Sequence, residues 1–203
     1  MRIVRAQMVQ SFYTPAQYRD GGLPEIAIVG RSNAGKSSLI NALCGNRKLA
    51  RVSGAPGKTR SINGFLINDA FLLMDLPGYG FARRSAAEQN SWRQLVEGYL
   101  QQTHSLIHLL LLCDIRHDVS AGDVQMAQWL QYYGIPFTLV ATKADKLAKS
   151  KRPMQIQKLK KQLQAQQALG FSALEGVGKD ALLAELERIL AQSSHPQAQE
   201  KGE

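Results

Sequence analysis

Hydrophobic and polar positions along this chain predict strands and helices in turn. Short apolar runs that indicate buried strands fall at 25–29, 62–68, 70–75, 106–113, 136–141 and 169–172. Apolar residues at helical spacing indicate helices at 37–44, 88–102, 121–133, 151–168 and 177–191. We therefore expect a three-layer α/β fold with helices on both faces of a six-stranded, mostly parallel sheet that has one antiparallel edge strand.

The pattern places a single domain at 23–191, after a polar lead-in at 1–22 and before a polar tail at 192–203 that we expect to be disordered. A chain of 203 residues is long enough for one domain with a full core. Four aromatic residues fall on predicted helices at core-like spacing, and we expect them to pack in the core: Trp92, Trp129, Tyr132 and Tyr133.

Composition narrows the class of protein. Hydrophobic residues at 44% and charged residues at 20% are ordinary for a globular chain. No apolar run reaches the length of a membrane span, and residues 1–5 lack the apolar stretch of a signal peptide, so we expect no membrane insertion and a cytoplasmic protein. Cys44 and Cys113 have no metal-binding spacing and are expected to be buried free thiols. The net charge of +9 favours polyanionic partners such as nucleic acid or anionic lipid.

One segment between the first predicted strand and the first predicted helix matches GxxxxGK[ST]. In such a loop, backbone N–H groups and the helix N-terminus face a phosphate, the lysine adds a point charge, and the hydroxyl that follows ligates magnesium. The segment predicts a nucleotide phosphate loop made by Gly30, Arg31, Ser32, Asn33, Ala34, Gly35, Lys36, Ser37 and Ser38.

A second segment, DLPG, follows an apolar strand. It places a carboxylate at the C-terminal edge of the sheet, where a nucleotide-bound magnesium would lie, and a glycine whose N–H can approach the γ-phosphate. The predicted nucleotide contacts here are Asp75, Leu76, Pro77 and Gly78.

A third segment, TKAD, follows the strand predicted at 136–141 and distinguishes guanine from adenine. A carboxylate at Asp145 can accept hydrogen bonds from guanine N1–H and the 2-amino group, which adenine lacks. FSA, after the next strand, would supply a backbone contact to the guanine carbonyl. The predicted base site is Thr142, Lys143, Ala144, Asp145, Phe171, Ser172 and Ala173.

With these segments in order, residues 24–191 resemble the EngB (YihA, YsxC) family of bacterial GTPases, of the TrmE-Era-EngA-EngB-like class with a Ras-like P-loop domain. The resemblance is carried by GRSNAGKSSLIN, PGKTRSIN, DLPGYGFA, TKADKL and by DIRH at 114–117. It implies a monomeric GTP/GDP-binding protein that acts with the large ribosomal subunit or its precursor, through rRNA and ribosomal proteins. It also implies a link to cell division and septation.

The resemblance also implies site roles by position. Thr59 would be the switch threonine that ligates magnesium with Ser37 and Asp75, in a loop that lines the nucleotide with Gly57, Lys58, Thr59, Arg60 and Ser61. The residues expected to act in hydrolysis are Lys36, Thr59, Gly78 and Asn33. Arg60 and Gly64 differ from the residues usual in this switch segment. Thr142 stands where many GTPases have asparagine, as it does in EngB-like sequences, and this should weaken the hydrogen bond between the base loop and the phosphate loop.

Hydrolysis should be slow, because Tyr79 stands where Ras-like enzymes have a water-orienting glutamine. Asn33 either helps bind a stimulating K⁺ ion or only stabilises its loop. His117 is expected to anchor a loop rather than to take part in catalysis. Two basic clusters could face RNA, although the second could equally be a solvated helix face. They are Arg47, Lys48, Arg51, Lys58, Arg60, Arg83 and Arg84, and Lys146, Lys149, Lys151, Arg152, Lys158, Lys160 and Lys161.

Two rivals to the ribosomal role stay open from sequence. One is a signalling GTPase that acts directly on a division protein, with no ribosome contact. The other is a metabolic P-loop kinase, against which TKAD and the predicted hairpin at 62–75 argue.

Overall fold

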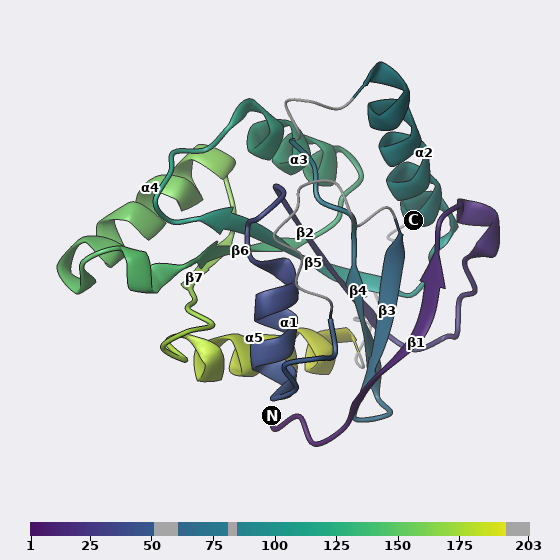
Figure 1. The fold of residues 1–203 in the computed structure, drawn as a ribbon, viewed down its shortest axis with the longest axis horizontal. Helices are drawn as coiled ribbons and strands as arrows, with labels where there is room; N and C mark the ends of the chain where they lie inside the picture. Colours follow the sequence, from purple (N-terminus) through teal and green to yellow (C-terminus); the bar gives the residue numbers. More distant parts are fainter. Residues whose placement is uncertain (51–60, 81–84, 194–203) are drawn as a thin grey trace, which may run out of the picture.

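Strands of one mixed sheet form the centre of the molecule, in the order β1-β3-β4-β2-β5-β6-β7 (Figure 1). The computed structural model describes residues 1–50, 61–80 and 85–193. Within them the strands are β1 Ala6–Phe12, β2 Glu25–Gly30, β3 Ile62–Ile67, β4 Phe71–Asp75, β5 Leu106–Asp114, β6 Phe137–Thr142 and β7 Gln167–Gly170. The α-helices are α1 Lys36–Cys44, α2 Ala86–Gln102, α3 Ala121–Tyr132, α4 Arg152–Leu163 and α5 Lys179–Ser193.

The sheet confirms the predicted fold class and corrects its strand count. It has seven strands in the described residues rather than six. β3 runs antiparallel to both of its neighbours, β1 and β4, so the antiparallel strand is second from the edge and not at the edge. The additional strand, β1, lies in the predicted lead-in. Its sequence, AQMVQSF, did not indicate a strand because only its last residue is buried.

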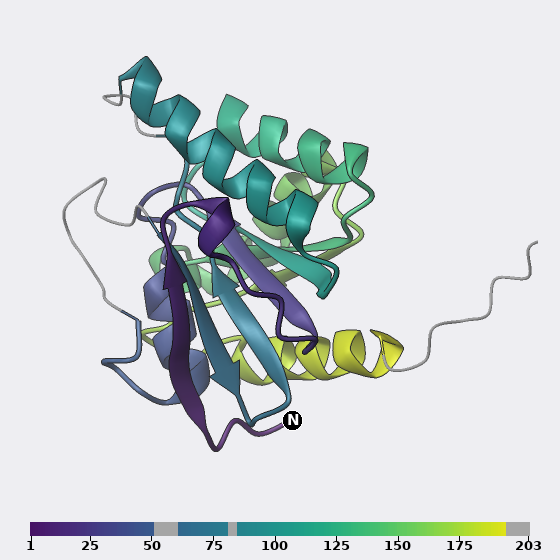
Figure 2. The ribbon, with the colours of Figure 1, turned by 90° about the vertical axis from the view of Figure 1, so that its right-hand side faces the viewer.

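Helices cover both faces of the sheet, as the pattern predicted (Figure 2). Because successive side chains of a strand point to opposite faces, Ala27 and Val29 of β2 join the core beneath α2, α3 and α4, and Ile26 and Ile28 join the core beneath α1 and α5. β2 and β5 are buried between these layers. Because β2 runs parallel to β4 and β5, and β5 runs parallel to β6, the carboxyl ends of these strands meet at one edge of the sheet. The predicted phosphate and base loops both start there.

Element boundaries agree with the prediction to within two residues except at the end of α4. The helix predicted at 151–168 ends at Leu163, where Gln164 takes a left-handed conformation with φ 53° and caps the helix. β7 then begins at Gln167 instead of residue 169. The helical spacing of apolar residues continues beyond the true end, so the pattern alone did not show this stop.

A buried carboxylate attaches the N-terminal segment to the sheet. Glu25, at the start of β2, is fully buried and accepts hydrogen bonds from the hydroxyls of Tyr18 (3.0 Å), Tyr99 (2.6 Å) and Thr103 (3.0 Å). Burial raises its pKa, which the three hydroxyls oppose. The rings of Phe12, Tyr18 and Tyr99 pack around it, with centroids 5.2–6.1 Å apart. β1 and the turn after it are thereby fixed against α2.

Two of the four aromatic residues expected in the core are not there. Trp92 and Trp129 are half-buried and pack against the core. Tyr132 is 83% exposed and Tyr133 41% exposed. They lie at the end of α3, and there the helical spacing continues past the last turn that the sheet covers.

The two cysteines were expected to be buried free thiols, and no segment was expected to cross a membrane. Cys113 is buried and Cys44 is partly buried, and both are free. Burial raises the pKa of the Cys44 thiol to about 11. Within the described residues no helix is both long and apolar enough to cross a membrane.

Candidate nucleotide-binding site

The phosphate loop lies between β2 and α1, as predicted. Two of its residues have positive φ: Asn33 at 65° and Gly35, the N-cap of α1, at 95°. The first N–H groups of any α-helix have no intrahelical acceptor, so the amides of Lys36 and Ser37 are free to bind an anion. The loop therefore has the backbone shape and the donors that a phosphate needs.

Glycines let the DLPG segment approach the phosphate loop closely. A Cβ on Gly78 would lie 3.1 Å from Ser32 N and 3.2 Å from Gly30 O, so a larger residue would push the two segments apart. The next residue joins them: Ser32 N–H donates to Tyr79 O at 3.0 Å and Tyr79 N–H donates to Gly30 O at 3.3 Å. The phosphate loop and the segment after Asp75 are therefore one hydrogen-bonded unit.

Asp75 ends β4 at the edge where β2 gives way to the phosphate loop. It is only 4% exposed, and its Oδ1 is the buried side-chain oxygen that has no hydrogen-bond partner within the described residues. Burial raises the pKa of Asp75 to about 6, against the opposing charge of Lys36. An unpartnered buried carboxylate oxygen is costly, which is a reason to expect a cation or an ordered water beside it.

The base loop is tied to the phosphate loop by a threonine hydroxyl. Thr142, at the end of β6, donates from Oγ1 to Ala34 O at 2.6 Å, and the same oxygen lies 3.1 Å from Cys113 O. Threonine at this position, in place of asparagine, therefore does make the hydrogen bond between the two loops. A hydroxyl on a strand end reaches the carbonyl because β6 and β2 end at the same edge of the sheet.

A second tie comes from Lys143 and was not predicted. Its Nζ donates to Asn33 O at 2.7 Å and forms an ion pair with Asp114 Oδ2 at 2.8 Å. Arg116 binds the same carboxylate through Nε (2.9 Å) and Nη2 (2.7 Å). Burial raises the pKa of Asp114, but the bonds from Arg116 and Lys143 outweigh it, and the pKa lies well below its ordinary value. The carboxylate thus holds the lysine stem in place.

The remaining base-site residues lie together as the sequence indicated. Ser172 Oγ donates to Asp145 Oδ1 at 2.7 Å, and this hydrogen bond lowers the pKa of Asp145. Ala144 N–H donates to Phe171 O at 3.0 Å, which joins the TKAD and FSA segments. Asp145 is therefore oriented and ionised at neutral pH, as recognition of guanine N1–H and its 2-amino group requires.

Several predicted residues lie outside the described part of the chain. These are Gly57, Lys58, Thr59 and Arg60 of the predicted switch loop, and Arg51, Arg83 and Arg84 of the first basic cluster. Ser61, which follows the loop, is buried and donates to Asn63 Oδ1 at 3.2 Å. Within the described residues no cluster of three or more His, Cys, Asp or Glu side chains is placed to hold a metal.

The DIRH segment is explained in part. Asp114 and Arg116 form the ion pair that holds Lys143, a role for which spacing gave no signal because Lys143 lies on the next strand's loop. His117 follows, and its backbone N–H donates to Asp114 O at 3.1 Å while its carbonyl accepts from Gln155 Nε2 at 3.3 Å. The same segment borders a hollow of about 170 Å³ beside the phosphate loop.

Sequence reasoning also missed two side chains that hold the DLPG segment. Trp92 Nε1 donates to Pro77 O at 2.8 Å, and Tyr79 donates from its hydroxyl to Asp123 Oδ1 at 2.8 Å. The position of Tyr79 directly after DLPG was a usable signal. The position of Trp92 was not, since the contact depends on how α2 returns across the sheet.

The sheet order, the phosphate loop and the base loop at one edge define a P-loop GTPase. The family described as "50S ribosome-binding GTPase" matches residues 25–143. The probable GTP-binding protein EngB of Alkaliphilus metalliredigens (strain QYMF) is 44% identical over 99% of this chain and 98% of its own. The chain belongs to the EngB family of GTP-binding proteins.

Solved structures share the fold. A crystal structure of a probable GTP-binding protein engB has a TM-score of 0.69 and 23% identity, covering 83% of this chain and 99% of that chain. S. thermophilus NFeoB bound to GDP.AlF4⁻ and K⁺ has a TM-score of 0.59 and 25% identity, covering 82% of this chain and 62% of that chain.

Proposed function

We propose that this GTPase hydrolyses GTP slowly and uses the nucleotide state to time its association with the large ribosomal subunit or a precursor of it. The proposal that the protein hydrolyses GTP and responds to the nucleotide state rests on one observation. The phosphate loop, the DLPG segment and the base loop are joined to one another by hydrogen bonds. A ligand that contacts Gly78 acts directly on Tyr79, and through Ser32 and Gly30 on the phosphate loop. Such an arrangement makes the segment after Gly78 sensitive to the γ-phosphate.

Phosphoryl transfer to water requires the γ-phosphate to be held, its charge to be neutralised and a water to be aligned. Lys36 and the first N–H groups of α1 hold the phosphates. Asp145 selects guanine, and the stem of Lys143, fixed by Asp114 and Asn33 O, lies beside the base. These residues bind and orient the substrate.

Magnesium fits this donor set. Asp75 has a buried carboxylate oxygen without a partner in the described residues, and Ser37 is the hydroxyl that follows the loop lysine. Mg²⁺ bound through one or two protein oxygens and the substrate phosphates is the usual arrangement in such sites. Ser37 and Asp75 would hold the ion, with Thr59, which lies outside the described residues, as the third ligand. When bound, Mg²⁺ neutralises charge that develops on the phosphates.

The environment of Tyr79 supports slow turnover. This residue occupies the position after Gly78, but its ring is 7% exposed and its hydroxyl is bound to Asp123 in the core. Because its hydroxyl is already bound to Asp123, Tyr79 is not available to orient a water. Water alignment must come from elsewhere, which keeps the intrinsic rate low.

Surface charge and family membership support the ribosomal half of the proposal. The chain carries a net charge of +9. Around α4, four lysines have no side-chain partner among the described residues: Lys149, Lys151, Lys160 and Lys161. Contacts of lysine with phosphate release counterions, so binding to RNA should weaken as salt rises. A role in ribosome assembly would also connect this GTPase to cell division and septation.

Co-sedimentation with ribosomal subunits tests the proposal. The purified protein is loaded with GDP or with a non-hydrolysable GTP analogue and mixed with separated subunits at several salt concentrations. Binding to the large subunit that depends on the nucleotide and weakens with salt is the expected result. Absence of binding in both states would refute the ribosomal role. Capture of a division protein that resists ribonuclease would then favour the signalling alternative.

Potassium stimulation is a second part of the proposal. Asn33 has a left-handed backbone, with φ 65°. Its backbone carbonyl already accepts a hydrogen bond from Lys143, so the group of Asn33 that we propose for K⁺ binding is its side-chain amide. We expect GTP hydrolysis to be faster in KCl than in NaCl of equal ionic strength, and Asn33→Ala to remove the difference while GDP binding is kept. Equal rates in the two salts would assign Asn33 to loop stabilisation only.

A further inference from the structure

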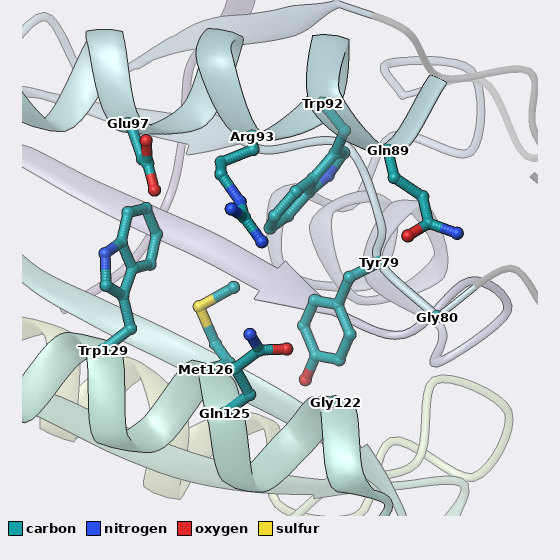
Figure 3. Close-up of a pocket in the computed structure, with 10 residues that line it drawn as sticks. All are labelled: Tyr79, Gly80, Gln89, Trp92, Arg93, Glu97, Gly122, Gln125, Met126 and Trp129. Carbon is teal, nitrogen blue, oxygen red and sulfur yellow. The ribbon is translucent and has the colours of Figure 1, made fainter. Parts of the chain in front are cut away.

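A pocket of about 440 Å³ opens between α2 and α3, beside the DLPG segment (Figure 3). Side chains from both helices and from the segment after DLPG point into it, and three of them are aromatic: Trp92 of α2, Trp129 of α3 and Tyr79 of that segment. Met126 lies between them on the α3 side. Aromatic residues and methionine are the types enriched where proteins bind other proteins.

Two opposite charges line the same pocket without forming an ion pair. Arg93 and Glu97 are one helical turn apart on α2, and both reach toward α3 (Figure 3). Neither side chain has a hydrogen bond or an ion pair with any described residue. A peptide backbone offers what both need, because its C=O can accept from a guanidinium and its N–H can donate to a carboxylate.

The aromatic surface continues from the pocket along α3. Trp129 contacts the ring of Tyr133 edge to face at 5.3 Å, and Tyr133 contacts Tyr132 in the same way at 5.2 Å. Tyr132 is 83% exposed. A run of contacting aromatic rings that ends in solvent exceeds the scattered apolar residues normal on a surface, and it marks an interaction site.

Local charge favours a protein over RNA as the occupant. The charged residues that line the pocket are Arg93 and Glu97, and their charges sum to zero. The chain as a whole carries +9. A phosphate backbone would find no net positive charge here and would meet the Glu97 carboxylate, whereas the neutral backbone of a peptide matches one cation and one anion.

The pocket walls are also bound to the segment that contacts the nucleotide. Trp92 Nε1 donates to Pro77 O at 2.8 Å. Tyr79 exchanges backbone hydrogen bonds with Gly30 and Ser32 of the phosphate loop. An occupant that moves either ring therefore moves the residues on both sides of Gly78.

We propose that the α2–α3 pocket is the docking site for a segment of a partner protein. The segment inserts one large apolar side chain between the indoles of Trp92 and Trp129, and its backbone pairs with Arg93 and Glu97. Sensitivity of this docking to the nucleotide rests on the proposed GTP switch, whereas the docking itself does not.

The chain's own tryptophans give a direct readout. It has two, and both line the pocket, so protein labelled with 5-fluorotryptophan gives two ¹⁹F NMR signals that report on this site alone. A random linear peptide library displayed on phage is selected on the wild-type protein and depleted on a Gln125→Phe variant, in which the pocket mouth is filled. The recovered peptides are then synthesised and titrated.

We expect the recovered peptides to share a large apolar residue and to shift both ¹⁹F signals. Gln125→Phe should weaken their binding at least tenfold. Gln128→Phe is the matched control, because Gln128 is an equally exposed glutamine of α3 that does not line the pocket, and it should bind as the wild type does. Failure to recover peptides sensitive to Gln125→Phe would overturn the proposal. So would ¹⁹F shifts produced by single-stranded RNA and not by peptides.

The experiment distinguishes failure of peptide docking from failure of the proposed GTP switch. Both glutamine variants should bind and hydrolyse GTP at the wild-type rate, since neither residue contacts the nucleotide site. Peptide affinity is then compared in the GDP form and the GTP-analogue form. A difference of several-fold supports coupling through Pro77 and Tyr79, and equal affinities refute the coupling while docking stands on the variant data.

Discussion

In the proposed base site, Asp145 is the residue that would select the base. Its carboxylate has its pKa lowered by the Ser172 hydroxyl and is therefore an acceptor at neutral pH. Replacement by asparagine exchanges one acceptor oxygen for a donor. The guanine 2-amino group then faces an amide NH₂, while the 2-carbonyl of xanthine would find a partner there.

We expect Asp145→Asn to weaken GTP binding about 100-fold, because one hydrogen bond to a charged group, which contributes roughly 1.5–3 kcal/mol, is replaced by two donors that face each other, and the remaining one is no longer made to a charge. Binding of xanthosine triphosphate should improve in the same variant. Equilibrium titration with fluorescent nucleotide analogues measures both. Asp180→Asn, an exposed carboxylate at the start of α5, is the control and should change neither.

His108 links stability to pH. It is 7% exposed on β5, and its Nε2 lies 2.9 Å from Thr138 Oγ1, which donates in turn to Glu185 at 3.0 Å. Since that hydroxyl's proton goes to Glu185, the imidazole donates from Nε2. Burial lowers the pKa of His108 from 6.5 to about 4; the charge of Glu185 opposes this shift and the charge of Arg188 adds to it.

The sign of the pH effect follows from this lowered pKa. As pH falls from 6.5 toward 4, the unfolded chain binds a proton at this site and the folded protein does not, so the free energy of unfolding falls by about 3 kcal/mol. Urea unfolding of the wild type and of His108→Gln across this range should show the loss in the wild type beyond what the variant shows. Parallel curves would refute the assignment.

Helix α2 is held against the N-terminal segment by a glycine. A Cβ added to Gly98 would lie only 2.7 Å from the Cβ of Pro15 and would collide with the proline ring. That ring belongs to the short 3-10 turn Pro15–Gln17 and has little freedom to move. Glycine inside a helix otherwise costs about 1 kcal/mol relative to alanine. For Gly98→Ala, packing against Pro15 therefore predicts a lower free energy of unfolding, whereas helix propensity predicts a higher one.

We expect Gly98→Ala to destabilise the protein by about 1–3 kcal/mol, because overpacking at a rigid contact outweighs the gain in propensity. Chemical denaturation gives the value. Gln94→Ala, at an exposed position of the same helix, should stay within about 0.5 kcal/mol of the wild type. A stabilised Gly98→Ala would show that Pro15 moves aside.

The elements predictable from sequence are those whose apolar residues form either a continuous run, as in a buried strand, or a helical repeat. β2, β4, β5 and β6 are buried throughout, or nearly so, and were predicted for that reason. β1 was missed because it pairs through its backbone at the sheet edge and leaves Met8 and Val9 exposed. Phosphate and base loops were predictable because their chemistry fixes residue types. The Lys143–Asp114 pair was not, since it depends on two strands ending side by side.

For the whole molecule, nucleotide binding should appear as added stability. A ligand that binds only the folded state at about 100 times its Kd raises the free energy of unfolding by about 2.7 kcal/mol. We expect GDP with Mg²⁺ to raise the thermal unfolding midpoint accordingly, and ATP to leave it unchanged. EDTA should reduce the effect of GDP if Ser37 and Asp75 hold the ion. Equal stabilisation by ATP would contradict the assigned base site.

The position of β1 at the sheet edge has a consequence for how the chain folds while it is being synthesised. β1 leaves the ribosome first, but its partner β3 begins at Ile62, and the central strand β2 pairs with β4 and β5, which come later still. Neither β1 nor β2 can therefore pair with another strand until β3 or a later strand has emerged. The first β-hairpin that can close is β3 with β4, at residues 62–75 of 203, so the sheet grows outward from this hairpin and not from the first strand of the sequence, and β1 can add to the edge only once β3 exists.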